Sequence, residues 1–220
     1  MPVTLSIKSA RHALRGVLWG AAAALFLAGG APATAAETPT EAVRSTVNEV
    51  IRLLSDEELK QPAQSEKRRK LVEEAVGQRF DYEELAKRSL AAQWTKLSQA
   101  ERQEFVDLFK SLLSNTYGDK IEGYAGEQVH YLKERLEGAY AEVQTKVSSN
   151  KTDMPLDYRL LNKSGDWRVY DVVVDGVSLV KNYRGQFERI IKTESYAALV
   201  EKLRKKSSDI KAPRSKAKGS

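Results

Sequence analysis

The chain has 220 residues, no cysteine, two histidines and a formal net charge of +6. Without cysteine it can form neither a disulfide nor an acylated-cysteine membrane anchor, so an ordinary hydrophobic core must stabilise it. Residues 1–35 carry +3, and residues 204–220 carry seven bases against Asp209, which leaves about −3 on residues 36–203. The basic balance therefore belongs to the two ends, and we predict no nucleic-acid partner.

The first 35 residues have the order of a cleavable signal peptide. Three basic residues precede an apolar run at 17–28, and small residues follow it. The run of about 12 residues is well short of the roughly 20 that a membrane-spanning helix needs, and no later stretch approaches that length. We expect cleavage after Ala35 or Ala36 and a mature, periplasmic protein that does not span a membrane.

Two helices are predicted directly after this leader. Thr38 and Glu41 form a capping box, and apolar residues at helical spacing continue from there to about Leu54. Pro62 marks a break in the pattern. A second helix is predicted over residues 65–76.

A short helix and a long helix come next. Asp81 has the position of an N-cap for a helix that ends near Leu90. Ser98 and Glu101 form a second capping box and begin the strongest helical pattern of the chain, whose apolar stripe continues to Tyr124. Glycines in and after that stretch predict its end.

From residue 128 the apolar pattern changes to a period of two, which predicts strands. Alternation covers residues 140–147, 156–160 and 167–174, and a turn at 163–166 joins the last two as a hairpin. Three consecutive valines at 172–174 interrupt the alternation. They predict a strand that is covered on both faces or one that carries a bulge.

The order of elements predicts one α+β domain. Helical patterns return near residues 183–191 and from 195 onward, so helices precede and follow the strands. We expect a signal peptide at 1–35, a folded domain at 36–204 and a disordered basic tail at 205–220.

The residues that could carry chemistry are sparse. His130 is the only histidine beyond the leader. We expect it to be a surface or partly buried structural residue, because zinc needs several His or Cys ligands. Asp171 and Asp175 are about 13 Å apart on an extended strand, too far for a catalytic carboxylate pair. Ser178 lacks the glycine pattern of a nucleophile elbow, and no phosphate-binding loop is present. We expect no metal, no cofactor and no enzymatic activity.

Several motifs together resemble the MlaC or toluene-tolerance family, over roughly residues 40–204. Ala91 departs from the family pattern, in which glycine is expected, and the basic tail lies beyond the family core. The resemblance rests on Trp94, Phe105, Phe109, Tyr117 and the segments 124–126, 167–172, 176–179 and 182–187.

The resemblance implies a periplasmic phospholipid carrier. Its fold would be similar to nuclear-transport-factor domains, with helices packed on a curved antiparallel sheet that encloses an apolar pocket. Its partners would be an outer-membrane lipoprotein complex and an inner-membrane ABC transporter complex with a membrane-anchored substrate-binding subunit. A monomer would shuttle phospholipid between these complexes and so maintain outer-membrane asymmetry.

Ten apolar or aromatic residues are the predicted lipid-binding set, chosen by periodicity. Ordinary core packing is the alternative for each residue, and we expect about half of them to contact lipid. The set comprises Phe109, Leu112, Tyr117, Ile121 and Tyr124 on the long helix, and Val143, Val147, Leu160, Val172 and Val174 on the sheet.

Other interpretations remain open at this point. Arg184 could bind a lipid phosphate, but a structural ion pair with Asp171 or Glu188 is favoured. An isomerase or dehydratase on the same fold would use Asp171 as its base, a protein-binding adaptor would carry no lipid, and a hopanoid could replace the phospholipid. The bases of the tail could attract anionic headgroups or simply be solvated.

Overall fold

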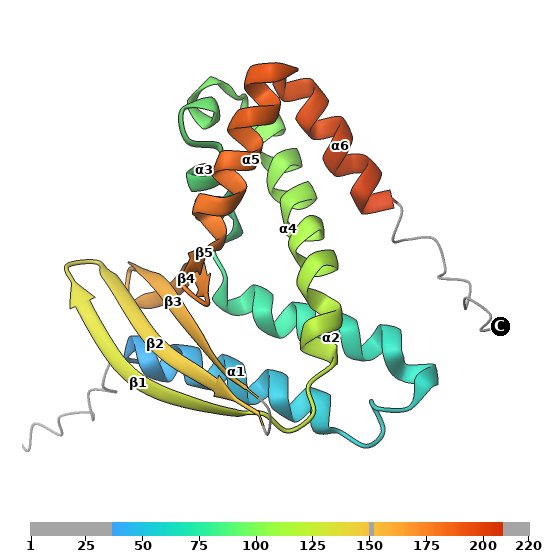
Figure 1. Cartoon of the computed structure of the whole chain (residues 1–220), viewed down its shortest axis with the longest axis vertical. Coiled ribbons are helices and arrows are strands. Elements are labelled where there is room, and N and C mark those ends of the chain that lie inside the picture. The colour runs from blue at the N-terminus through green and yellow to red at the C-terminus, as the bar shows by residue number, and fades with distance from the viewer. Residues whose placement is uncertain (1–36, 150–151, 209–220) are drawn as a thin grey trace, which may run out of the picture. The chain divides into compact units, whose positions relative to one another are not determined.

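A computed structural model describes residues 37–149 and 152–208 (Figure 1). The predicted leader and most of the predicted tail lie outside these residues. Within the described ranges, no helix combines the length and apolar character needed to cross a membrane.

The helices follow the predicted order. Both capping boxes form: the Thr38 hydroxyl accepts from the Glu41 N–H at 3.2 Å, and the Ser98 hydroxyl accepts from the Glu101 N–H at 3.3 Å. The α-helices are α1 (Pro39–Ser55), α2 (Ser65–Arg79), α3 (Tyr82–Leu90), α4 (Gln99–Glu122), α5 (Leu179–Thr193) and α6 (Tyr196–Ser208), and two short 3-10 helices cover Pro62–Gln64 and Ala91–Lys96.

Two helix boundaries differ from the prediction. Helix α5 begins at Leu179, four residues earlier than expected, because the Ser178 hydroxyl caps it by accepting from the Lys181 N–H at 3.1 Å. Helix α6 continues to Ser208, past the predicted domain boundary at residue 204. The first residues of the predicted tail are therefore helical.

Five antiparallel strands form one sheet in sequential order. They are β1 (Gln128–Glu137), β2 (Tyr140–Ser148), β3 (Asp153–Lys163), β4 (Asp166–Val174) and β5 (Val177–Ser178). In β4 the register shifts at Tyr170, because Arg159 pairs with Asp171 whereas Leu160 pairs with Val169. Such a bulge increases local twist. Val172 and Val173 are both buried on opposite faces just after it, so both explanations for the valine run are confirmed.

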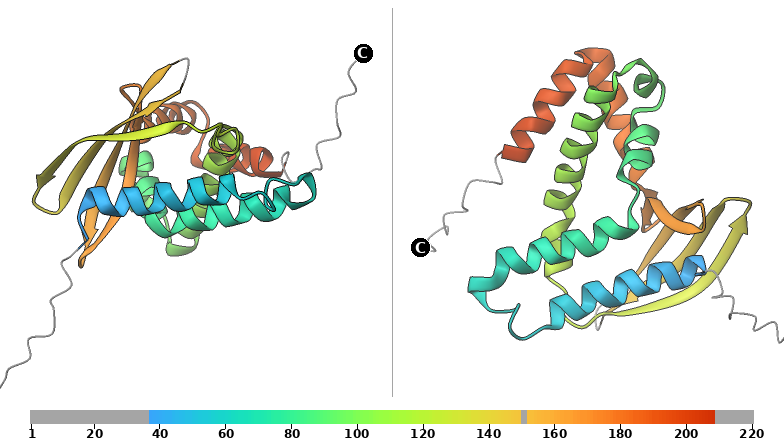
Figure 2. Two further views of the ribbon diagram at one scale, coloured as in Figure 1. Left: turned by 90° about the horizontal axis from the view of Figure 1, so that it is seen from below. Right: turned by 180° about the vertical axis from the view of Figure 1, so that it is seen from behind.

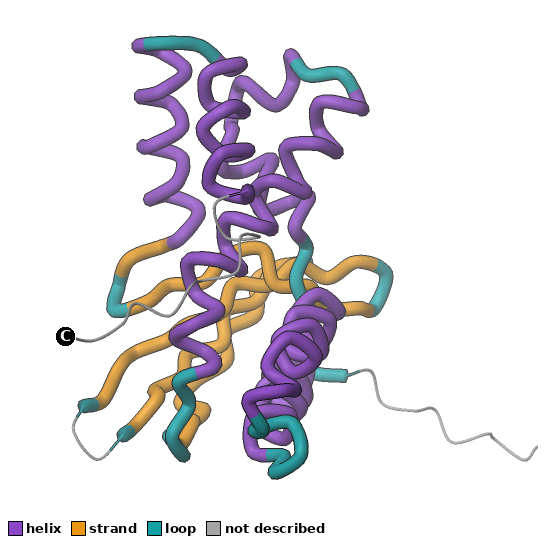
Figure 3. Tube along the Cα trace, turned by 90° about the vertical axis from the view of Figure 1, so that its right-hand side faces the viewer, coloured by secondary structure: helices purple, strands orange, loops and turns teal. Residues whose placement is uncertain are grey.

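Helix α1 covers one face of the sheet, which we call the inner face, and α2 runs beside α1 (Figures 1 and 2). Ala42 and Val43 of α1 pack there against Val143 and Leu160. Helices α3, α5 and α6 and the first half of α4 gather beyond one end of the sheet (Figures 1 and 3). This arrangement is the α+β class, with helices on a curved antiparallel sheet.

The helical end has an aromatic core of its own. Phe105 and Phe109 of α4 contact Phe187 of α5 with ring centroids 5.6 and 5.2 Å apart, and Tyr183 lies 5.0 Å from Phe109. Edge-to-face pairs of this kind add to the stabilisation from burial alone. The first half of α4 is therefore fixed within the helical cluster, while its second half extends toward α2 and the sheet.

Candidate functional site

A cavity of about 510 Å³ lies between α1, α2, the second half of α4 and the inner face of the sheet. Its volume is within the range of ligand pockets. Most of its wall is aliphatic: Val50 and Ile51 come from α1, Val76 from α2 and Leu156 from β3. The space can therefore take a ligand with a large apolar part.

Six of the ten residues predicted to bind lipid line this cavity. They come from the second half of α4, the loop after it and the two strands β2 and β4: Tyr117, Ile121, Tyr124, Val147, Val172 and Val174.

The other four predicted residues lie in the cores and are absent from the cavity wall. Phe109 and Leu112 belong to the aromatic core with α5, because this part of α4 packs inside the helical cluster. Val143 and Leu160 lie under α1. The helical and strand periods are the same in core and cavity wall, so periodicity cannot separate the two groups.

The contribution of α1 and α2 to the cavity is missing from the predicted set. Val47, Val50 and Ile51 belong to the apolar stripe of α1, and Val76 continues the wall on α2. They are only half-buried, whereas Val43 and Leu53 of the same helix are buried. The sequence contains the stripe but no signal that part of it faces an open space.

Charged groups gather at the cavity edge near the end of α4. Arg69, Lys120, Glu122 and Glu127 all line it there, and the Arg69 Nε lies 3.1 Å from a Glu122 carboxylate oxygen. Residues from the other side of the cavity, such as Leu85 and Leu179, are apolar. The cavity is therefore amphipathic, with a charged mouth and an apolar interior.

The cavity tyrosines stay uncharged well above neutral pH. Burial raises the pKa of Tyr82 to about 12, with the nearby Glu73 adding to the effect. Burial, with Tyr183, raises the pKa of Tyr117 to about 12, and burial also raises the pKa of Tyr158. Their hydroxyls can donate hydrogen bonds within the cavity wall.

These shifts predict the direction of an alkaline effect on stability. A raised tyrosine pKa favours the neutral form in the folded state, so its contribution to stability is complete below about pH 10 and is lost above it. We expect urea midpoints to fall between about pH 10 and 12, with less of this fall in the Tyr82→Phe and Tyr117→Phe variants. Tyrosinate absorbance of the folded chain with a midpoint near pH 10 for all its tyrosines would contradict the shifts.

Asp171, the candidate base of the enzyme alternative, does not line the cavity. Its carboxylate accepts from the Ser178 hydroxyl at 2.6 Å, the Val180 N–H at 3.0 Å and the Arg159 Nη1 at 3.1 Å. These bonds hold β4 against the start of α5. The carboxylate is thus structural, and its ion-pair partner is Arg159.

Arg184 lies away from the cavity wall as well. Its Nε donates to the Arg88 carbonyl at 3.0 Å, so it joins α5 to α3 in place of the predicted pairs with Asp171 or Glu188. His130 is exposed on β1. Within residues 37–149 and 152–208, no three His, Cys, Asp or Glu side chains are grouped to hold a metal ion.

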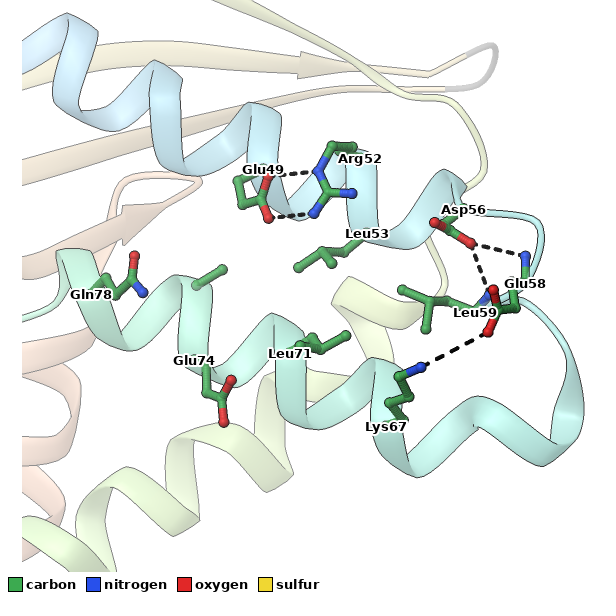
Figure 4. Close-up of a pocket in the computed structure, with 11 residues that line it drawn as sticks. Glu49, Arg52, Leu53, Asp56, Glu58, Leu59, Lys67, Leu71, Glu74 and Gln78 are labelled. Carbon is green, nitrogen blue, oxygen red and sulfur yellow. Dashed lines mark hydrogen bonds and ion pairs between the residues drawn. The ribbon is translucent and has the colours of Figure 1, made fainter.

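A smaller hollow of about 340 Å³ lies between α1 and α2 (Figure 4). Charged side chains surround it and pair with one another: Arg52 lies 2.6 Å from Glu49, and Lys67 lies 3.9 Å from Glu58. Its aliphatic floor is small, with Leu53 and Leu71 among its members. This charged groove does not suit a large apolar ligand.

The fold and the cavity define a class of α+β domains in which helices and an open antiparallel sheet surround an amphipathic space. A family model described as MlaC protein matches residues 44–205. The chain therefore belongs to the MlaC family, as the sequence motifs predicted.

Individual relatives agree with this assignment. The chain is 26% identical to the toluene tolerance protein ttg2D of Pseudomonas putida over 156 residues, which is 70% of this chain and 73% of the relative. It is 23% identical to the intermembrane phospholipid transport system binding protein MlaC of Haemophilus influenzae over 125 residues, 54% of this chain and 58% of the relative.

A solved structure has the same fold. The phospholipid-binding protein from Ralstonia solanacearum, determined in complex with a phospholipid, aligns with a TM-score of 0.70 at 25% sequence identity. The alignment covers 77% of this chain and 97% of that protein.

Proposed function

We propose that the chain is a periplasmic phospholipid carrier that holds the acyl chains of one lipid in the cavity. The observation that carries the proposal is the amphipathic cavity of about 510 Å³ in a fold similar to that of a protein solved with a phospholipid. The six predicted residues in its wall, Ile121 and Val172 among them, would contact the chains.

The energetics of lipid transfer explain why such a cavity is needed. Moving one CH₂ group out of water is favourable by roughly 0.8 kcal/mol, so burying about 30 acyl carbons is favourable by on the order of 24 kcal/mol. A lipid therefore does not cross water unaided. The apolar wall replaces the membrane interior, while the charged mouth lets the headgroup keep its hydration.

We further propose that the carrier moves lipid between an outer-membrane lipoprotein complex and an inner-membrane ABC transporter complex with its membrane-anchored substrate-binding subunit, maintaining outer-membrane lipid asymmetry. Support comes from the family and from the relative named as an intermembrane phospholipid transport component. A carrier without an energy source can only equilibrate lipid, so the partner complexes must set the direction.

Transfer between vesicles tests the carrier activity. Donor liposomes with a self-quenched fluorescent phospholipid are mixed with unlabelled acceptor liposomes. The chain, exported to a bacterial periplasm and purified without detergent, is then added. We expect dequenching at a rate proportional to protein concentration. Transfer no faster than in buffer would contradict the carrier function.

A further inference from the structure

We propose that Arg69 is the residue by which the cavity recognises the phosphate of its lipid, an inference that rests on the proposed function. Arg69 and Lys120 are the cations of the described chain that line the cavity. The Arg69 side chain is 34% exposed, so its guanidinium can be reached both from the solvent and from the cavity. This is the place where the headgroup of a lipid held by its acyl chains must lie.

The present partners of Arg69 are carboxylate oxygens, and of its Nη2 and its buried Nε only Nη2 donates a hydrogen bond to them. Its Nη2 lies 3.1 Å from a carboxylate oxygen of Asp119, and its Nε lies 3.1 Å from one of Glu122. A guanidinium binds two such oxygens through a planar fork, which matches phosphate as well as carboxylate. Lys120 adds a second positive charge but no fork.

Exchange of a carboxylate for phosphate would leave no buried charge without a partner. Glu122 also lies 3.3 Å from Nη2 of Arg68 and would keep that ion pair. Asp119 is 54% exposed, so water can take the place of the guanidinium. Arg69 can therefore turn to a ligand at low cost, whereas Arg68 does not line the cavity.

Gly118 provides the room that Arg69 occupies. A Cβ at this position would lie 3.0 Å from Nη2 of Arg69. Alanine would therefore displace the guanidinium, which is the flexible end of its side chain, without changing any charge. Gly118→Ala tests the position of the charge, and Arg69→Gln tests its presence.

The experiment compares two ligands with identical acyl chains, phosphatidylglycerol and diacylglycerol, by displacement of a fluorescent lipid. Because Arg69→Gln removes a charge-assisted pair, we expect it to weaken the binding of phosphatidylglycerol relative to that of diacylglycerol on the order of tenfold. Gly118→Ala should lower the ratio of phosphatidylglycerol affinity to diacylglycerol affinity by a smaller factor. Lys70→Gln is the matched control because it removes a cation from the same helix outside the cavity, where Lys70 lies 3.9 Å from Glu74; its affinity ratio should equal that of the unmodified chain.

Two results would overturn the assignment. Equal weakening of the binding of both ligands by Arg69→Gln, or an equal change of the affinity ratio in Lys70→Gln, would reduce Arg69 to a structural bridge between α2 and α4 while leaving the carrier function intact. Failure of the unmodified chain to bind either ligand would instead refute the proposed function itself.

Discussion

Replacing Ile121 with tryptophan is expected to weaken phospholipid binding on the order of 100-fold. Ile121 is half-buried in the cavity wall on the second half of α4. An indole that displaces about four acyl methylenes costs roughly 3 kcal/mol at ~0.8 kcal/mol for each. The cavity has room for the ring, so the melting temperature should change little. Displacement of a fluorescent phospholipid measures the affinity.

Thr116→Trp provides the control for this substitution. Thr116 lies on the same helix but is exposed and does not line the cavity. Its tryptophan variant should bind lipid like the unmodified chain. Unchanged binding by Ile121→Trp, with a correctly folded protein, would mean that the acyl chains lie elsewhere.

Replacing Asp171 with alanine is expected to destabilise the fold by about 3 kcal/mol. Removing the acceptor of a buried donor leaves that donor unsatisfied, at a cost of about 1–3 kcal/mol. The Ser178 hydroxyl and the Val180 N–H would lose their acceptor, and Arg159 would keep only Glu142. Urea unfolding measures the loss, and lipid affinity of the folded fraction should remain unchanged.

Glu142→Ala is the matched control for Asp171. Glu142 lies 3.4 Å from the same Arg159, but both side chains are partly exposed there, so its removal should cost about 1 kcal/mol or less. Equal effects of the two substitutions would contradict the structural role of Asp171. A variant that loses an activity on lipid without losing stability would revive the enzyme alternative.

The order of the secondary structure could be predicted because its signals are local. The Thr38 and Ser98 capping boxes fix the starts of α1 and α4, and the alternation in β2 and β4 defines two strands. The early start of α5 could not be predicted in the same way. It depends on the Ser178 hydroxyl, which is held by Asp171 from the neighbouring strand.

The cavity could be predicted only in part, because core and cavity wall have the same apolar pattern. Tyr117 and Ile121 lie one turn or more beyond Phe109 and Leu112 on α4, yet the first pair faces the cavity and the second pair the aromatic core. The difference arises because α5 packs against α4 near Phe109, whereas α2 contacts α4 near its C-terminal end. The charged mouth at Arg69 likewise forms only when α2 meets the end of α4.

Native mass spectrometry of the exported chain, purified without detergent and followed by lipid extraction, is the most direct test of the carrier function. We expect a folded protein whose mass includes one two-chain phospholipid, and extraction should recover that lipid in equal molar amount. An unliganded mass that persists after incubation with liposomes, or a cargo such as a hopanoid in place of phospholipid, would contradict it.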